Sequence, residues 1–241
     1  GQEVKLVDSS HQALVVRATD RSLGGTGVLN TGVISGVRAE LAANGGNVYA
    51  LAINNKGTVR ANGSVVKNGR VLLTAPGGTI ANSGDLIAKN ADGSGGEINI
   101  HTGESGLVTH TGNLNASGTT GGSVEVTAGS FDQWAAIQAS GSSGRGGDVT
   151  LNLGRDYTAT SAGDIEVRGT SGGDVIITAG RRIVTSGDID AVGTLGSGGN
   201  IDVSAGIKTS LLNARFDASG VTAGGRIRIG GEFQGGANGI D

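Results

Sequence analysis

The chain has 241 residues, a formal net charge of −3 and no cysteine. Without cysteine there is no disulfide framework and no zinc–thiolate site, and the lack of a basic excess argues against nucleic acid as a partner. No run of 18 apolar residues occurs, so the sequence predicts no membrane-spanning helix.

Glycine makes up 48 of the residues, far more than the usual share of about 7%. Collagen is excluded because there is no G-X-Y period and Pro76 is the only proline. Hydrophobic residues make up 36% of the chain and recur at fixed positions, which favours a packed core over disorder. We expect the glycines to supply positive φ angles at the corners of a repetitive fold.

Residues 1–44 are predicted to form N-terminal covering strands and irregular coils. Val4–Val7 and Ala13–Val16 are expected to be two strands that edge the first coil, and Leu29–Gly36 resembles the middle of a coil. Such a cover is needed because an open end of a β-helix offers unpaired backbone to other chains.

From Gly45 onward, a glycine phrase followed by alternating apolar residues returns eight times, as in GGSVEVTAG and GGDVIITAG. The glycines just before the alternating runs are 23 to 27 residues apart: Gly46, Gly69, Gly96, Gly122, Gly147, Gly173, Gly199 and Gly225. A repeat of this length is typical of a solenoid.

Each repeat contains up to three strand signals. Val124 and Val126 flank Glu125, which is the period of a strand with one buried face. A second phrase in residues 112–118, 163–169 and 187–193 predicts another strand, and stretches such as Asp156–Thr160 predict a third. The sequence therefore predicts an all-β, right-handed parallel β-helix of about 26 residues per coil and eight to nine coils. It forms a single domain over residues 1–241, with regular coils in residues 45–241.

The tract GGNVYALAINNKGTVRA (residues 45–61), followed by NGRVLLTA (residues 68–75), resembles the late secretion domain of filamentous-haemagglutinin-like exoproteins. These are the large surface adhesins of bacterial two-partner secretion, and the later repeats resemble the β-helical shaft that follows that domain. The resemblance implies a secreted or cell-surface chain that an outer-membrane two-partner-secretion transporter exports. The Asn-Pro-Asn motifs usual in that family are missing, so no transporter-recognition residue is carried over. We expect the chain to be a fragment of a longer protein.

Two successive coils carry an acidic constellation of Asp164, Glu166, Asp188 and Asp190. If the coils are in register, Asp164 lies beside Asp188 and Glu166 beside Asp190. Four carboxylates on one sheet are candidates for a cation, with calcium the natural ion, or for polysaccharide cleavage. The alternative, which we favour, is a solvated acidic face relieved by Arg168.

Asp148 and Asp174 head successive coils, in a column that Asn200 continues and Arg226 ends. They are expected to be corner residues that bond to nearby backbone.

Aromatic residues are scarce, and the segment from Ser130 to Trp134 is interpreted as a break in the repeat. Trp134 is a candidate for stacking on a sugar ring, although we favour a role in capping an irregular bulge. Leu211–Phe216 is interpreted as a comparable irregularity.

The three histidines, His11, His101 and His110, have no ligand-like spacing. His101 and His110 flank one corner and are predicted to lie on the surface.

Three classes of function remain open. We favour an adhesin segment that is not an enzyme, with no catalytic, cofactor-binding or metal-binding residue, whose partners are the transporter and glycans, host cells or biofilm polysaccharide. A carbohydrate-active β-helix enzyme would depend on the four carboxylates from Asp164 to Asp190. An ice-binding or other flat-surface solenoid would need a regular outward row of Thr or small residues on one face, whereas the outward column from Asn99 to Arg228 mixes charges.

Overall fold

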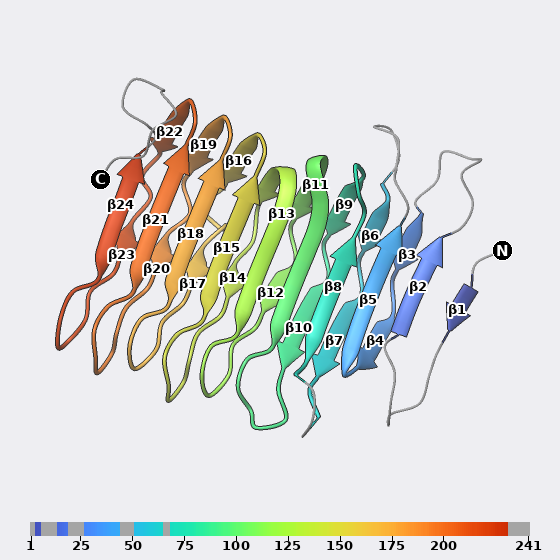
Figure 1. Cartoon of the computed structure of the whole chain (residues 1–241), viewed down its shortest axis with the longest axis horizontal. Coiled ribbons are helices and arrows are strands. Elements are labelled where there is room, and N and C mark those ends of the chain that lie inside the picture. Colours follow the sequence, from blue (N-terminus) through green and yellow to red (C-terminus); the bar gives the residue numbers. More distant parts are fainter. Residues whose placement is uncertain (1–2, 6–13, 19–26, 44–50, 65–67, 231–241) are drawn as a thin grey trace.

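The computed structural model describes residues 3–5, 14–18, 27–43, 51–64 and 68–230. These residues form a stack of coils in which short strands lie side by side along one long axis, and they contain no helix (Figure 1). The solenoid has about seven turns that are about 26 residues apart, which confirms the predicted fold class. The predicted count of eight to nine coils is too high. The first-row strand Arg38–Ala43 precedes Gly46, which lies outside the described residues, and the phrase at Gly225 is followed by a single described strand.

The strands form three rows. The first row contains β2 (Leu14–Ala18), β5 (Arg38–Ala43), β8 (Arg70–Thr74), β11 (Glu97–His110), β13 (Ser123–Gln133), β15 (Asp148–Leu153), β18 (Asp174–Ala179), β21 (Asn200–Ala205) and β24 (Arg226–Gly230). The second row contains β3 (Val28–Asn30), β6 (Ile53–Asn55), β9 (Thr79–Asn82), the ends of the long strands β11 and β13, β16 (Asp156–Ala159), β19 (Arg182–Thr185) and β22 (Lys208–Leu211). The third row, an eight-stranded sheet, contains β4 (Val33–Gly36), β7 (Thr58–Asn62), β10 (Asp85–Lys89), β12 (Asn113–Asn115), β14 (Ile137–Gln138), β17 (Ile165–Glu166), β20 (Ile189–Asp190) and β23 (Phe216–Asp217).

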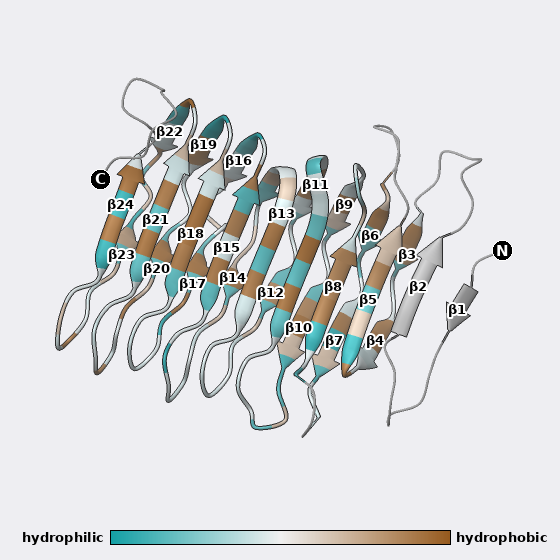
Figure 2. Ribbon diagram, viewed as in Figure 1, coloured by the Kyte–Doolittle hydropathy of each residue, from teal (hydrophilic) through white to brown (hydrophobic). Residues whose placement is uncertain are grey.

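Neighbouring coils pair in parallel and in register, so equivalent residues form straight columns. Val124 pairs with Ile98 on one side and with Val149 on the other, and all three side chains are buried. The intervening residue Glu125 is exposed, as the period of two requires. Figure 2 shows the resulting hydrophobic and hydrophilic bands, which continue from strand to strand across the first row.

The N-terminal strands edge the stack as expected. β2 extends the first row in parallel, and β1 (Glu3–Lys5) pairs antiparallel with β2. The expected coil segment Leu29–Gly36 contains parts of β3 and all of β4. Leu6, Val7 and Ala13 of the predicted edge strands lie outside the described residues.

The expectation that the corner glycines supply positive φ angles is wrong for most of them. Among the described glycines, only Gly77, Gly93 and Gly103 have positive φ. The paired glycines are needed instead because the backbones of adjacent coils come very close. A Cβ added to Gly173 would lie 1.9 Å from the carbonyl oxygen of Gly147, far closer than any non-bonded contact allows.

This close approach repeats along the stack as a glycine column: Gly96, Gly122, Gly147, Gly173, Gly199 and Gly225, in which each Cβ would collide with the carbonyl oxygen of the glycine one coil earlier. The same glycines close the coil, since the amide of Gly173 donates to the carbonyl of Val167 at 2.8 Å. The preceding glycine is equally confined in the pairs from Gly95–Gly96 to Gly198–Gly199: a Cβ on Gly198 would lie 1.8 Å from the carbonyl oxygen of Ala218.

Polar residues also lie inside the solenoid. Asn30, Asn55 and Asn82, which we call the asparagine column, share one register position and are buried together with His110. The prediction that His110 lies on the surface is therefore wrong, because its position in β11 faces inward. His101 is exposed as expected, and His11 lies outside the described residues.

The predicted irregularity between Leu211 and Phe216 contains a left-handed residue, Asn213, with φ of 62°. Asparagine tolerates this conformation better than most residues. The segment joins β22 to β23, so the deviation is confined to one corner of the last full coil.

The glycine pairs allow a matched test. Gly198→Ala is expected to lower the free energy of unfolding by at least about 2 kcal/mol, because the added methyl group meets a rigid carbonyl. Gly224 holds the same place one coil later, but a Cβ there meets none of the described residues within 4 Å, so Gly224→Ala should change stability by less than about 0.5 kcal/mol. Urea denaturation of both variants measures the difference. Equal effects would contradict the role assigned to the close approach.

Candidate functional site

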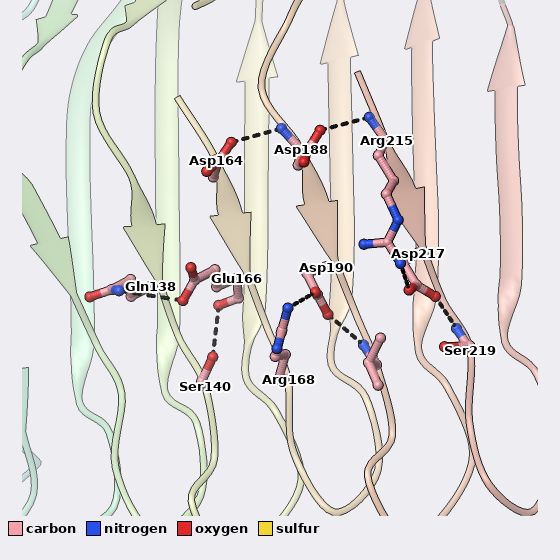
Figure 3. A network of polar contacts seen from close by, with 11 residues as sticks. Gln138, Ser140, Asp164, Glu166, Arg168, Asp188, Asp190, Arg215, Asp217 and Ser219 are labelled. Atoms are coloured by element: carbon pink, nitrogen blue, oxygen red, sulfur yellow. Dashed lines mark hydrogen bonds and ion pairs between the residues drawn. The ribbon is translucent and has the colours of Figure 1, made fainter. Parts of the chain in front are cut away.

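The predicted acidic residues lie on the outward side of the third row. Glu166 of β17 pairs in register with Asp190 of β20, as expected. Asp164 and Asp188 occupy the positions just before these two strands, one coil apart. Figure 3 shows the four carboxylates in two parallel lines along the stack.

The upper of these lines connects one coil to the next. The carboxylate of Asp164 accepts a hydrogen bond from the backbone amide of Asp188 at 2.8 Å, and Asp188 accepts one from the amide of Arg215 at 2.7 Å (Figure 3). A backbone amide bound to a carboxylate is a charge-assisted hydrogen bond. These carboxylates therefore add hydrogen bonds between coils beyond those of the strand backbones.

The second line is paired with polar and basic side chains. The amide nitrogen of Gln138 donates to Glu166 at 3.4 Å. Asp190 forms an ion pair with Arg168, the partner expected from the sequence, and accepts a bond from the amide of Val192 at 3.2 Å. Only 10% of the Asp190 side chain is exposed, so these bonds replace much of its hydration.

The sequence analysis missed a fifth carboxylate, Asp217, which continues this line from β23. Hydrogen bonds from Ser219, together with the neighbouring Arg215, hold the pKa of Asp217 below its usual range. The segment Phe216–Gly220 follows the second phrase in its Asp-Ala-Ser-Gly ending. Extending that phrase by one more coil would have located this residue.

The five carboxylates do not converge. Within the described ranges, no group of three or more His, Asp or Glu residues is arranged to hold a metal ion. The geometry of the patch is that of alternating acceptors and donors spread over successive coils.

Side chains also connect the coils in the column of Asp148, Asp174 and Asn200, at the start of the first-row strands. Arg145 bridges Asp148 at 2.9 Å and Asp174 at 2.7 Å. Asp174 also accepts the backbone amide of Asn200 at 3.0 Å, as expected of a residue that bonds to backbone. Both aspartates open strands rather than occupy corners.

The aromatic segment does not break the repeat, contrary to the sequence interpretation. Phe131 pairs in register with Val108 and Tyr157, is buried, and its ring centroid lies 5.9 Å from that of Tyr157. Trp134 follows β13 directly and is 57% exposed. Its ring is therefore accessible to a planar ligand such as a sugar.

A second residue near this tryptophan was missed by the sequence analysis. Asp132 lies two positions before Trp134, and its partial burial, together with the charge of Asp156, raises its pKa. Asp156 is itself in contact with Arg181 at 3.7 Å. No sequence pattern distinguished Asp132 from the other outward residues of its strand.

Comparisons of the chain with family models, with curated proteins and with solved structures find no match. In the part of the chain that the structure describes, no helix is long and apolar enough to cross a membrane.

Because the Asp190 side chain bonds to a backbone amide and the Arg168 side chain does not, removing Asp190 should destabilise the protein more than removing Arg168. Asp190→Ala should lower the free energy of unfolding by about 1–3 kcal/mol, because it leaves the Val192 amide without an acceptor. Arg168→Ala should cost less than Asp190→Ala, because Asp190 keeps its bond to the Val192 amide and the lost side chain is itself 56% exposed. Urea denaturation with and without calcium measures both, with Asp148→Ala as a solvent-exposed control.

Two results would contradict this expectation. One is an Asp190→Ala effect no larger than that of Asp148→Ala. The other is a calcium-dependent gain in stability that Asp190→Ala removes, which would favour a cation site.

Proposed function

We propose that this chain is a segment of a secreted bacterial surface adhesin of the two-partner-secretion type. Its β-helix serves as secretion domain and shaft and mediates attachment, aggregation or biofilm formation. Its partners are an outer-membrane transporter and glycans, host cells or biofilm polysaccharide.

One observation carries the proposal: the carboxylates on the third row are engaged in bonds between coils. Asp164 and Asp188 accept backbone amides of the following coil, and Asp190 is paired with Arg168. Hydrolysis of a glycosidic bond needs two carboxyl groups that face the same bond. Carboxylates that hold a rod together fit a scaffold better than an active site.

The way the coils stack supports export as an unfolded chain. Each strand pairs with its equivalents one coil before and one coil after, so structure can grow by adding one coil at a time. The chain has no cysteine, so no disulfide can obstruct its passage through a pore.

A carbohydrate-active enzyme remains the second candidate, and one observation favours it. Asp132 has a raised pKa beside a second carboxylate, that of Asp156, and an exposed tryptophan follows it by two residues. A carboxyl group with a raised pKa is the usual proton donor in glycoside hydrolysis.

A panel of bacterial and host polysaccharides tests both candidates in the same wells, by retained protein and by released reducing ends. We expect retention without cleavage. Trp134→Ala should weaken retention about tenfold, which corresponds to about 1.4 kcal/mol and is within the range of aromatic stacking. Leu195→Ala, which removes a comparably exposed apolar side chain from a loop, should leave retention unchanged.

The other outcomes are equally informative. Cleavage that Asp132→Asn abolishes would replace the adhesin proposal with the enzyme. A lack of retention on every polysaccharide would contradict glycan binding by this segment.

A further inference from the structure

The asparagine column ends on a buried histidine. The side-chain nitrogen of Asn30 donates to the side-chain oxygen of Asn55 at 2.7 Å, and Asn55 donates to Asn82 in the same way at 2.7 Å. The side-chain nitrogen of Asn82 then lies 3.1 Å from Nδ1 of His110. Each of these bonds crosses from one coil to the next, so the column joins four coils from within.

The backbone determines the direction of this column. The side-chain nitrogens of Asn55 and Asn82 each make a second bond, to the carbonyl oxygens of Gly57 and Gly84, both at 3.1 Å. A carbonyl oxygen only accepts, so turning either amide around would place two acceptors against each other. At the start of the column, the amide of Gly32 donates to the side-chain oxygen of Asn30, which requires the same direction.

This direction assigns the proton on His110. Because Asn82 presents its NH₂ group, Nδ1 of His110 must accept and carries no proton. The single ring proton is therefore on Nε2, which lies 3.4 Å from the carbonyl oxygen of Ala136. The imidazole is neutral and held in one tautomer by groups on both sides.

Among the described residues packed around His110, none carries a charge that compensates a positive imidazolium. The strands paired with its end of β11 are β9 and β13, and they contribute the inward residues Asn82 and Gln133, which do not titrate. The next coil contributes Tyr157, whose hydroxyl donates to Gln133 at 2.7 Å. Burial, together with the charge of Asp164, raises the pKa of Tyr157, so that phenol stays neutral. Asp132 and Asp156 occupy alternate, outward positions on β13 and β16.

We propose that His110 makes the first coils acid-sensitive: a proton on Nδ1 breaks the bond to Asn82 and opens the boundary between β9 and β11. The proton comes from solvent, and no covalent bond changes. The buried residues described in the later coils include no histidine, so the opening stays within the N-terminal part of the stack.

The pH range follows from the two states of the imidazole. Burial lowers the pKa of His110 from 6.5 to about 4 in the folded protein, so the unfolded chain binds the proton more tightly. Stability is complete above about pH 6.5, falls as the pH falls towards 4, and does not change further below that for this group. Between pH 7 and pH 5, this difference raises the opening equilibrium about 20-fold.

Amide hydrogen exchange of the full chain at pH 7 and pH 5, corrected for the intrinsic exchange rates, tests the proposal. The amides of Ser83, Thr111 and Trp134 bond across the coils concerned, and their protection should fall about 20-fold. His110→Asn continues the column with a group that does not titrate and should remove this loss. His101→Asn, which replaces an exposed histidine on the same strand, should keep it.

Nitrogen NMR of the histidine rings gives a second, independent readout on the unaltered chain. We expect His110 to show the Nε2–H tautomer at pH 7 and to titrate near pH 4. A proton on Nδ1 at pH 7 or a midpoint near 6.5 would overturn the proposal, as would an equal acid response in His110→Asn. If His110→Asn does not fold, the ring spectrum of the unaltered chain still tests the proposal.

Discussion

The near contact of backbones at the paired glycines is the constraint on which the whole stack depends. A side chain at Gly147 or Gly173 would collide with the carbonyl of the preceding coil, so each coil from Gly96 onward must return to the same place with no Cβ there. Variation is accommodated elsewhere. β11 shifts its register between His101 and Leu107, yet Gly122 still stacks on Gly96 after this irregularity. The corner maintains the repeat, and the rest of the coil is free to vary in length.

Alternation and repeat length predicted most of the fold, because each depends on periods that the sequence displays directly. The inward pair Val124 and Val126 is an example, and the recurrence of the second phrase at residues 163–169 and 187–193 correctly predicted that Glu166 lies beside Asp190. The role of the glycines was misjudged, since a glycine needed for positive φ and one needed for its missing Cβ look the same in a sequence. His110 was misplaced because a polar residue in an inward column is indistinguishable from a surface one by hydropathy. The recurrence of Asn followed two residues later by Gly, at Asn30, Asn55 and Asn82, was the signal that could have located the column.

The acidic residues of the third row have a structural explanation in the length of its strands. β17 and β20 have only two residues each, so their backbones supply few bonds between coils. Asp164 and Asp188 add acceptors just outside these strands, and Asp190 adds another within β20. Their number therefore reflects the short third side of the coil. Trp134, which is 57% exposed, has no such structural explanation.

The direction of the hydrogen bonds has a mechanical consequence. Because the strands run across the stack and pair only with the coils before and after, a force along the axis loads the coils in series, one boundary at a time. Each released coil of about 26 residues lengthens the chain by roughly 80 Å while removing only about 5 Å of rod. A rod under tension would therefore gain length one coil at a time.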